Sequence, residues 1–221
     1  RNRMGTISES KYGDIWCPTY DGQACLFDVE SEKFIDVLQP IELSTKQTNY
    51  VTRIYSLEKG IAWILCENGY AFRVDEQLCK KGEGITLYAP SNHNLKGDQI
   101  FNVYQDSEED EWILTDKGVS IIGKKTLDTD FPFQFITQIK ESIYLIAEND
   151  KLARYDFHTK KLKFVDIPYP HDKINNVTTI GKDMLALGTD NGLILYSIPQ
   201  NSFQQIDIRT CLLYTSPSPR D

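Results

Sequence analysis

Three histidines are the side chains of this chain best suited to proton transfer near neutral pH, and they stand far apart in the sequence. His158 lies in the turn RYDFHTKKLKF, where we expect an ordinary exposed side chain. His93, between two asparagines, and His171 lie in the irregular segments APSNHNLKGD and IPYPHDK, the second of which also holds Tyr169. A tyrosine ring can stack on a sugar while a histidine hydrogen-bonds its hydroxyls. These loop residues are candidates for a ligand site, with plain surface loops as the alternative.

An acidic run is the only dense cluster of carboxylates in the sequence. It comprises Asp106, Glu108, Glu109, Asp110 and Glu111. A calcium loop would need a central glycine and regularly spaced oxygen ligands, and the run has neither. It lies between two apolar segments, so we expect a solvated hairpin turn and no metal site.

Known catalytic motifs are absent from the sequence. It has no GxSxG, HExxH, Walker loop or GxGxxG pattern. The lone Gly82-Glu83-Gly84 reads as a turn between strands. We therefore predict no catalytic residue and no cofactor in this chain, and we assign no specific ligand-binding residues.

The cysteines do not suggest a disulfide framework. Residues 1–210 contain Cys17, Cys25, Cys66 and Cys79. Counting back from a two-residue turn at Asp21-Gly22 pairs Cys17 with Leu26, which places Cys17 and Cys25 on opposite faces of the hairpin. No CxxC or Cys/His spacing indicates zinc. We expect the cysteines to act as small buried hydrophobic residues.

A short hairpin module recurs five times in the sequence. These modules determine where the histidines, the acidic run and the cysteines lie in the fold. In each copy a turn residue follows six positions after a core residue: Trp16 and Gly22, Trp63 and Gly69, Trp112 and Gly118, Tyr144 and Asp150, Ala186 and Gly192. The dipeptides Asp21-Gly22, Asn68-Gly69 and Asn191-Gly192 favour the positive φ of two-residue hairpin turns. The repeated tryptophans are expected to be packing residues and not ligand contacts.

Further strands can be placed around each hairpin. Short runs rich in Val, Ile, Phe, Tyr and Thr precede the hairpins at 51–56, 100–106, 135–139 and 174–180. Similar runs follow them at 34–38, 85–89, 161–167 and 203–208. Four strands in each repeat of roughly 30 to 50 residues are typical of a propeller blade. No window of helical length shows an apolar stripe of helical period.

The sequence therefore predicts an all-β chain, a β-propeller of five four-stranded blades in an incomplete ring of seven. The expected blades span residues 1–40, 41–90, 91–130, 131–170 and 171–210. Residues 211–221, CLLYTSPSPRD, have no place in the repeat and resemble a translated sequencing adapter. We expect these residues to be a non-native tail; a natural Pro-rich linker is the alternative.

Charge excludes some classes of partner. The 221 residues carry 24 basic and 32 acidic side chains, a net charge of −8, without a basic stripe. Nucleic-acid binding is therefore not expected. There is no apolar stretch of about 18 residues, so we expect no membrane contact by these residues.

Two modules carry a family resemblance. They are NLKGDQIFNVYQDSEEDEWILTDKGVSII (94–122) and INNVTTIGKDMLALGTDNGLILYS (174–197). Together with the hairpin period, they resemble the two-component regulator propeller repeat over most of residues 5–208. That repeat makes up the periplasmic sensor region of hybrid two-component histidine kinases in glycan-degrading gut bacteria. Tyr144 and Ala186 depart from the family pattern, which has Trp at those positions.

The resemblance implies a sensor function outside the cytoplasm. It implies a periplasmic domain of an inner-membrane protein, with a second propeller, the kinase domain and homodimerisation supplied by other parts of the full-length protein. It also implies an oligosaccharide as the small-molecule ligand and control of glycan-utilisation genes. It transfers no ligand-binding residue to this chain. A propeller-fold lyase and a non-catalytic interaction scaffold are the alternatives.

Overall fold

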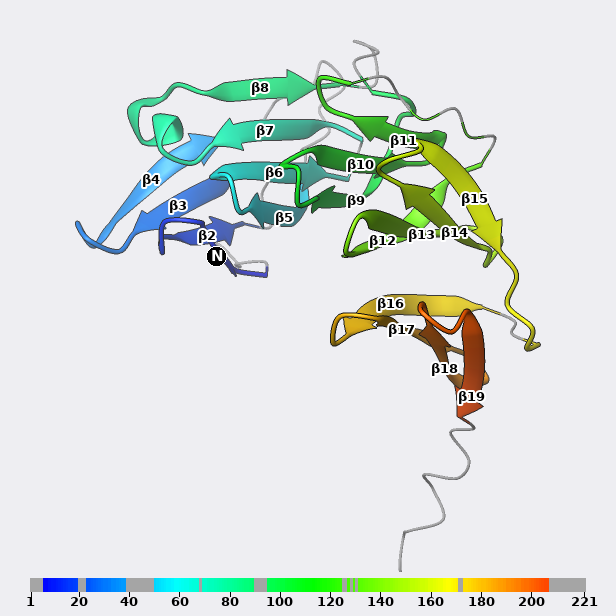
Figure 1. The fold of residues 1–221 in the computed structure, drawn as a ribbon. Helices are drawn as coiled ribbons and strands as arrows, with labels where there is room; N and C mark the ends of the chain where they lie inside the picture. Colours follow the sequence, from blue (N-terminus) through cyan, green and yellow to red (C-terminus); the bar gives the residue numbers. More distant parts are fainter. Residues whose placement is uncertain are drawn as a thin grey trace, which may run out of the picture. The chain divides into compact units, whose positions relative to one another are not determined.

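The computed structural model describes residues 6–19, 23–38, 50–67, 69–89, 95–124, 127, 129, 131–170 and 173–206. Within these ranges the regular structure is antiparallel β-sheet, apart from one short 3-10 helix, η1 (Leu78–Lys81). The strands form five sheets, each built from strands that are consecutive in sequence (Figure 1). The prediction of an all-β chain of repeated hairpins is confirmed. The predicted tail, 211–221, lies outside the described residues.

The first compact unit, residues 1–130, contains three sheets. The first sheet consists of β1 (Ser8–Glu9), β2 (Ile15–Pro18), β3 (Ala24–Asp28) and β4 (Lys33–Leu38). The second consists of β5 (Val51–Leu57), β6 (Ile61–Cys66), β7 (Ala71–Asp75) and β8 (Ile85–Tyr88). The third consists of β9 (Ile100–Gln105), β10 (Glu111–Thr115) and β11 (Gly118–Ile121). An isolated bridge joins Val119 to Leu127 on the open side of β11, where a fourth strand is expected.

The second compact unit, residues 131–221, contains the fourth and fifth sheets. The fourth sheet consists of β12 (Phe133–Ile139), β13 (Ser142–Ala147), β14 (Leu152–Asp156) and β15 (Lys161–Val165). The fifth consists of β16 (Ile174–Ile180), β17 (Met184–Thr189), β18 (Gly192–Ser197) and β19 (Ser202–Ile206). The strands predicted before the hairpins correspond to β5, β9, β12 and β16, and those predicted after them to β4, β8, β15 and β19.

Burial is highest in the inner strands of the second, third and fourth sheets, and in the fourth sheet it falls toward the last strand. Every residue of β6, β10 and β13 is buried. Both faces of these strands are therefore covered, which explains continuous apolar sequences such as IAWILC and SIYLIA. The last strand of the fourth sheet, β15, contains only exposed and half-buried residues. Polar and charged side chains are tolerated there for this reason.

Apolar clusters fill the space between neighbouring sheets inside each unit. Trp16 of the first sheet packs in one cluster with Ile64 of the second. Trp63 of the second sheet packs in another with Ile113 of the third. Trp16, Trp63 and Trp112 are each at most 1% exposed. The prediction that these tryptophans are packing residues is confirmed.

The hairpin turns differ from the predicted two-residue turns at the Gly-containing dipeptides. In the second sheet, the Cys66 N–H closes a three-residue turn whose last member is Gly69, with φ 82°. Asp150 takes the same position in the fourth sheet, with φ 61°. This arrangement is a turn followed by a left-handed residue, the usual three-residue hairpin loop. In the third and fifth sheets the turn does have two residues, but it lies one position earlier in the sequence than predicted. Gly118 and Gly192, which were expected in the turn, already begin the next strand.

The longer turn also corrects the predicted pairing of the cysteines. Cys17 lies directly opposite Cys25, and not opposite Leu26 as expected. The Thr19 N–H donates to the Gln23 carbonyl and Pro18 pairs with Ala24, so the register is shifted by one residue from the predicted one. A shift of one residue moves a side chain to the other face, so the two cysteines share a face. Neither is in a disulfide. The buried cysteines are Cys17, Cys66 and Cys79.

Candidate functional site

The loop residues proposed from the sequence do not form a site in the described part of the chain. His93 and His171 lie outside the described residues. His158 is exposed in the β14–β15 turn, as predicted, with its Nε2 2.6 Å from Glu141 Oε2. Tyr169 is half-buried in the apolar cluster between the fourth and fifth sheets, and its hydroxyl donates to the Phe203 carbonyl at 3.1 Å. Tyr169 is therefore a packing residue and not an open stacking platform.

The acidic run forms the predicted hairpin turn, but its first and last members are not solvated as expected. Asp106 and Glu111 are only 5% and 1% exposed. Asp106 Oδ1 accepts the backbone N–H groups of Glu108 and Asp110, both at 2.9 Å, and Glu109 takes a positive φ. The turn is therefore organised by a buried carboxylate.

The buried carboxylates accept hydrogen bonds from the three tryptophans. The pairs are Trp16 Nε1 with Glu76 Oε1 at 2.8 Å, Trp63 Nε1 with Glu111 Oε2 at 2.6 Å, and Trp112 Nε1 with Asp106 Oδ2 at 2.7 Å. A buried indole N–H needs an acceptor, so each carboxylate satisfies a group that the sheet packing buries. In the first two pairs, the acceptor belongs to the next sheet.

Glu111 also carries an ion pair. Arg73 donates to both of its oxygens, with Nη2 2.7 Å from Oε1 and Nε 2.9 Å from Oε2, and Lys59 approaches the same carboxylate. Burial raises the pKa of Glu111, but hydrogen bonds from Arg73, Lys59 and Trp63 lower it by more, so it lies below its ordinary value. This ionised group is fully engaged in structure and is not available as a general base.

The described ranges show neither a metal-binding cluster nor a membrane-spanning helix. There, no group of three or more His, Cys, Asp or Glu side chains is arranged to hold a metal ion. None of the helical structure described is long and apolar enough to span a bilayer.

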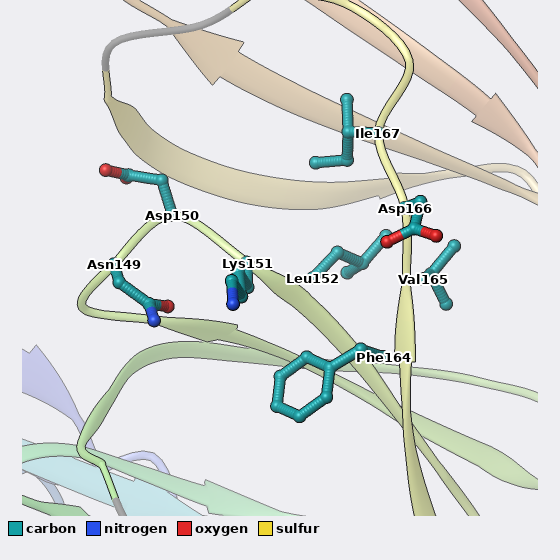
Figure 2. A pocket seen from close by; sticks show the side chains of 8 residues that line it. All are labelled: Asn149, Asp150, Lys151, Leu152, Phe164, Val165, Asp166 and Ile167. Carbon is teal, nitrogen blue, oxygen red and sulfur yellow. The ribbon is translucent and has the colours of Figure 1, made fainter.

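Within the described residues, one hollow on the fourth sheet is a candidate for a ligand site. It has a volume of about 390 Å³, which lies within the range of small-molecule sites. It is lined by Asn149, Asp150, Lys151, Leu152, Phe164, Val165, Asp166 and Ile167 (Figure 2). We call it the fourth-sheet hollow.

The turn between β13 and β14 supplies one wall of the fourth-sheet hollow. Asp150 holds this turn in place, because its left-handed backbone ends the loop and its Oδ1 accepts the Ile174 N–H at 2.6 Å. Its neighbours Asn149 and Lys151 are both exposed. Figure 2 shows these two side chains facing the hollow, while the Asp150 carboxylate points away from the Phe164 ring.

The end of β15 supplies the opposite wall. Phe164 is 47% exposed, which is unusual for a phenylalanine, and it contacts Phe131 with ring centroids 5.4 Å apart. Lys151 Nζ lies 6.0 Å from the centre of the Phe164 ring, within range of a cation–π contact. Leu152 is fully buried beneath them. Asp166 follows β15 and is exposed.

The fourth-sheet hollow presents the kinds of groups that contact small molecules. It combines an open aromatic ring with an amide, an ammonium group and a carboxylate from three separate side chains. The sequence predicts ligand contacts in the segments between repeats. Asp166 and Ile167, which follow β15, begin such a segment. That prediction missed Asn149, Lys151 and Phe164. The one available signal was an aromatic residue among lysines in the outer strand KLKFV.

Comparisons of sequence identify no relative. No family model matches the chain, and the search of curated proteins finds no match.

Comparisons of structure do find similar folds. The extracellular domain of a hybrid two-component system, BT4673 from B. thetaiotaomicron, has a TM-score of 0.66 and 20% identity, over 92% of this chain and 30% of that chain. The corresponding domain of BT3049 from the same organism has a TM-score of 0.62 and 17% identity, over 92% of this chain and 30% of the other. U3-55K has a TM-score of 0.63 and 11% identity, over 93% and 65% of the two chains.

These likenesses show the fold. The chain spans about a third of the length of the first two-component structures it resembles. Sheets of consecutive antiparallel strands, stacked through apolar clusters, are the blades of a β-propeller. The chain therefore has a β-propeller fold, shared with the extracellular domains of hybrid two-component systems.

Proposed function

We propose that this chain is part of an extracytoplasmic sensor propeller of a hybrid two-component histidine kinase. The observation that carries the proposal is the shared fold, at a TM-score of 0.66 over 92% of the chain, with the extracellular domain of such a system. The repeat pattern of the sequence supports the same assignment. Because one fold can serve many functions, the assignment needs the repeat pattern of the sequence beside the shared fold.

The proposed ligand is an oligosaccharide and the proposed output is transcription of glycan-utilisation genes. In this scheme the propeller is not itself an enzyme. Ligand binding in the periplasm changes how two sensor chains associate, and the altered association biases a kinase domain elsewhere in the full-length protein. The described residues support a recognition role, because their buried carboxylates are engaged in structure and their open hollow presents an aromatic ring.

The test is made in the bacterium that carries the gene. Transcripts of glycan-utilisation genes are measured after exposure to single purified oligosaccharides, with the gene intact, interrupted, and interrupted but complemented by an intact copy. Induction by one class of oligosaccharide should be lost on interruption and restored by the copy. Unchanged induction by every oligosaccharide after interruption would contradict the proposal.

A further inference from the structure

We propose that the fourth-sheet hollow binds one sugar ring of a neutral oligosaccharide. This inference rests on the proposed sensor function and deepens it by assigning a recognition site. The hollow is built entirely from the fourth sheet and the residues that follow it, so the site is contained in one blade.

The shape and apolar surface of the hollow suit a pyranose. Such a ring has an apolar face of C–H groups and a rim of hydroxyls. The Phe164 ring is 47% exposed, and a flat apolar surface of this kind complements the C–H face. Its contact with Phe131 fixes the ring, which reduces the entropy lost on binding. The volume of about 390 Å³ is adequate for a small molecule and leaves the remaining sugars in solvent.

The polar groups around Phe164 match the hydroxyl rim. Asn149 can both donate and accept, Lys151 donates, and the Asp166 carboxylate accepts. Hydroxyls need both kinds of partner, and all three side chains are exposed at the edge of the hollow. Asp150 is already committed through one oxygen to the Ile174 N–H, so it holds the turn.

The charge pattern favours a neutral ligand. Lys151 and Asp166 line the hollow with opposite charges, and the third charged lining residue, Asp150, adds a negative charge that is turned away from the Phe164 ring, so no net positive charge attracts an anionic sugar. A uronic acid would meet a carboxylate wherever it met the ammonium group, because both line one small hollow. A neutral sugar incurs no such repulsion.

Calorimetric titration of the full chain with maltotetraose, cellotetraose, xylotetraose and tetragalacturonate tests the site. At least one neutral tetrasaccharide should bind, and more tightly than tetragalacturonate. Phe164→Ala should weaken that binding about tenfold, and Phe164→Trp should preserve it, since a larger ring offers the same flat face. Asn149→Ala should weaken it severalfold through loss of hydrogen bonds.

Phe34→Ala is the matched control. Phe34 also lies on the last strand of its sheet, is 59% exposed and contacts a second phenylalanine, Phe27, with ring centroids 5.0 Å apart. Its replacement should leave sugar binding unchanged. If Phe164→Ala binds as tightly as the original chain, the site is wrong while sugar sensing stands. If tetragalacturonate binds more tightly than every neutral tetrasaccharide, the assignment of a neutral ligand is wrong. Absence of any binding overturns the inference, and the transcription experiment then decides the sensor function independently.

Discussion

Trp63 and Glu111 join two neighbouring sheets through a single buried hydrogen bond, in which the indole Nε1 donates to Oε2 at 2.6 Å. Trp16 and Glu76 repeat the relationship between the first and second sheets at 2.8 Å. Each tryptophan is thus packed by one sheet and hydrogen-bonded by the next. Because an indole N–H left unpaired in the core would destabilise the fold, the two pairs favour one arrangement of adjacent sheets.

Replacing the acceptor should be costly at the second of these contacts. Glu111→Gln keeps an oxygen for Trp63 but removes the charge that Arg73 and Lys59 share. We expect the free energy of unfolding to fall by about 2 to 3 kcal/mol, less than for a fully buried pair because both cations are partly exposed. Urea unfolding at neutral pH measures the change. Glu108→Gln, in the same turn but exposed, should cost well under about 1 kcal/mol. Equal losses in the two variants would refute this account of Glu111.

The same carboxylate predicts a dependence on pH. The pKa of Glu111 is lowered in the folded chain from an ordinary value of 4.5, so its stabilisation is fully present above pH 4.5 and is lost as pH falls through the folded pKa. The difference in unfolding free energy between the original chain and Glu111→Gln should therefore shrink between neutral pH and about pH 3. Urea unfolding across this range is the measurement. A difference that stays constant or grows on acidification would argue against an ionised Glu111.

Two glycines beside η1 allow the cost of a left-handed backbone to be separated from the cost of steric overlap. Gly82 and Gly84 both have positive φ, 77° and 72°. A Cβ at Gly82 would meet open space, whereas one at Gly84 would lie 2.8 Å from Leu78 Cβ and 2.9 Å from Asp75 Cβ. Gly82→Ala should cost about 1 kcal/mol for its left-handed backbone, and Gly84→Ala about 2 to 3 kcal/mol, because steric overlap adds to it. Thermal unfolding of both variants checks this; a smaller loss for Gly84→Ala would show that the neighbouring backbone yields.

The rate at which each cysteine is alkylated should decrease with its burial. Burial raises the pKa of Cys66 to about 12 and, with nearby carboxylates, that of Cys79 to about 11, whereas Cys25 is half-buried. Since the thiolate is the reactive form, iodoacetamide should modify Cys25 before Cys66 and Cys79 in the folded chain. Cys66 and Cys79 should react at a comparable rate only in urea. Peptide mass spectrometry over time follows each site separately. Native labelling of Cys66 as fast as Cys25 would mean that the second sheet opens readily.

Strands were predictable from sequence because their signals are local. Apolar runs such as 51–56 and 174–180 match observed strands closely, and the six-residue step correctly located the positive-φ positions Gly69 and Asp150. Turn length was not predictable, because Asn-Gly and Asp-Gly also suit the end of a three-residue loop. That single extra residue displaced the predicted partner of Cys17.

The contacts between sheets could not be predicted from patterns in the sequence. Glu76 lies 60 positions from Trp16, and nothing local marks it as an acceptor. The sequence pattern marks Glu111 only as part of an acidic run, although Glu111 is the first residue of the buried strand that contains Trp112. The fourth-sheet hollow combines a turn residue, Asn149, with an outer-strand residue, Phe164, and both types are common on surfaces. Only the paired strands bring them together.

The complete gene from which the chain comes provides the most direct test of the proposal that this propeller is the sensor part of a hybrid histidine kinase. Reading that gene to its stop codon should reveal a membrane-spanning helix encoded after the propeller, followed by a histidine-kinase domain. A complete gene that encodes neither a membrane helix nor a kinase domain would contradict the claim.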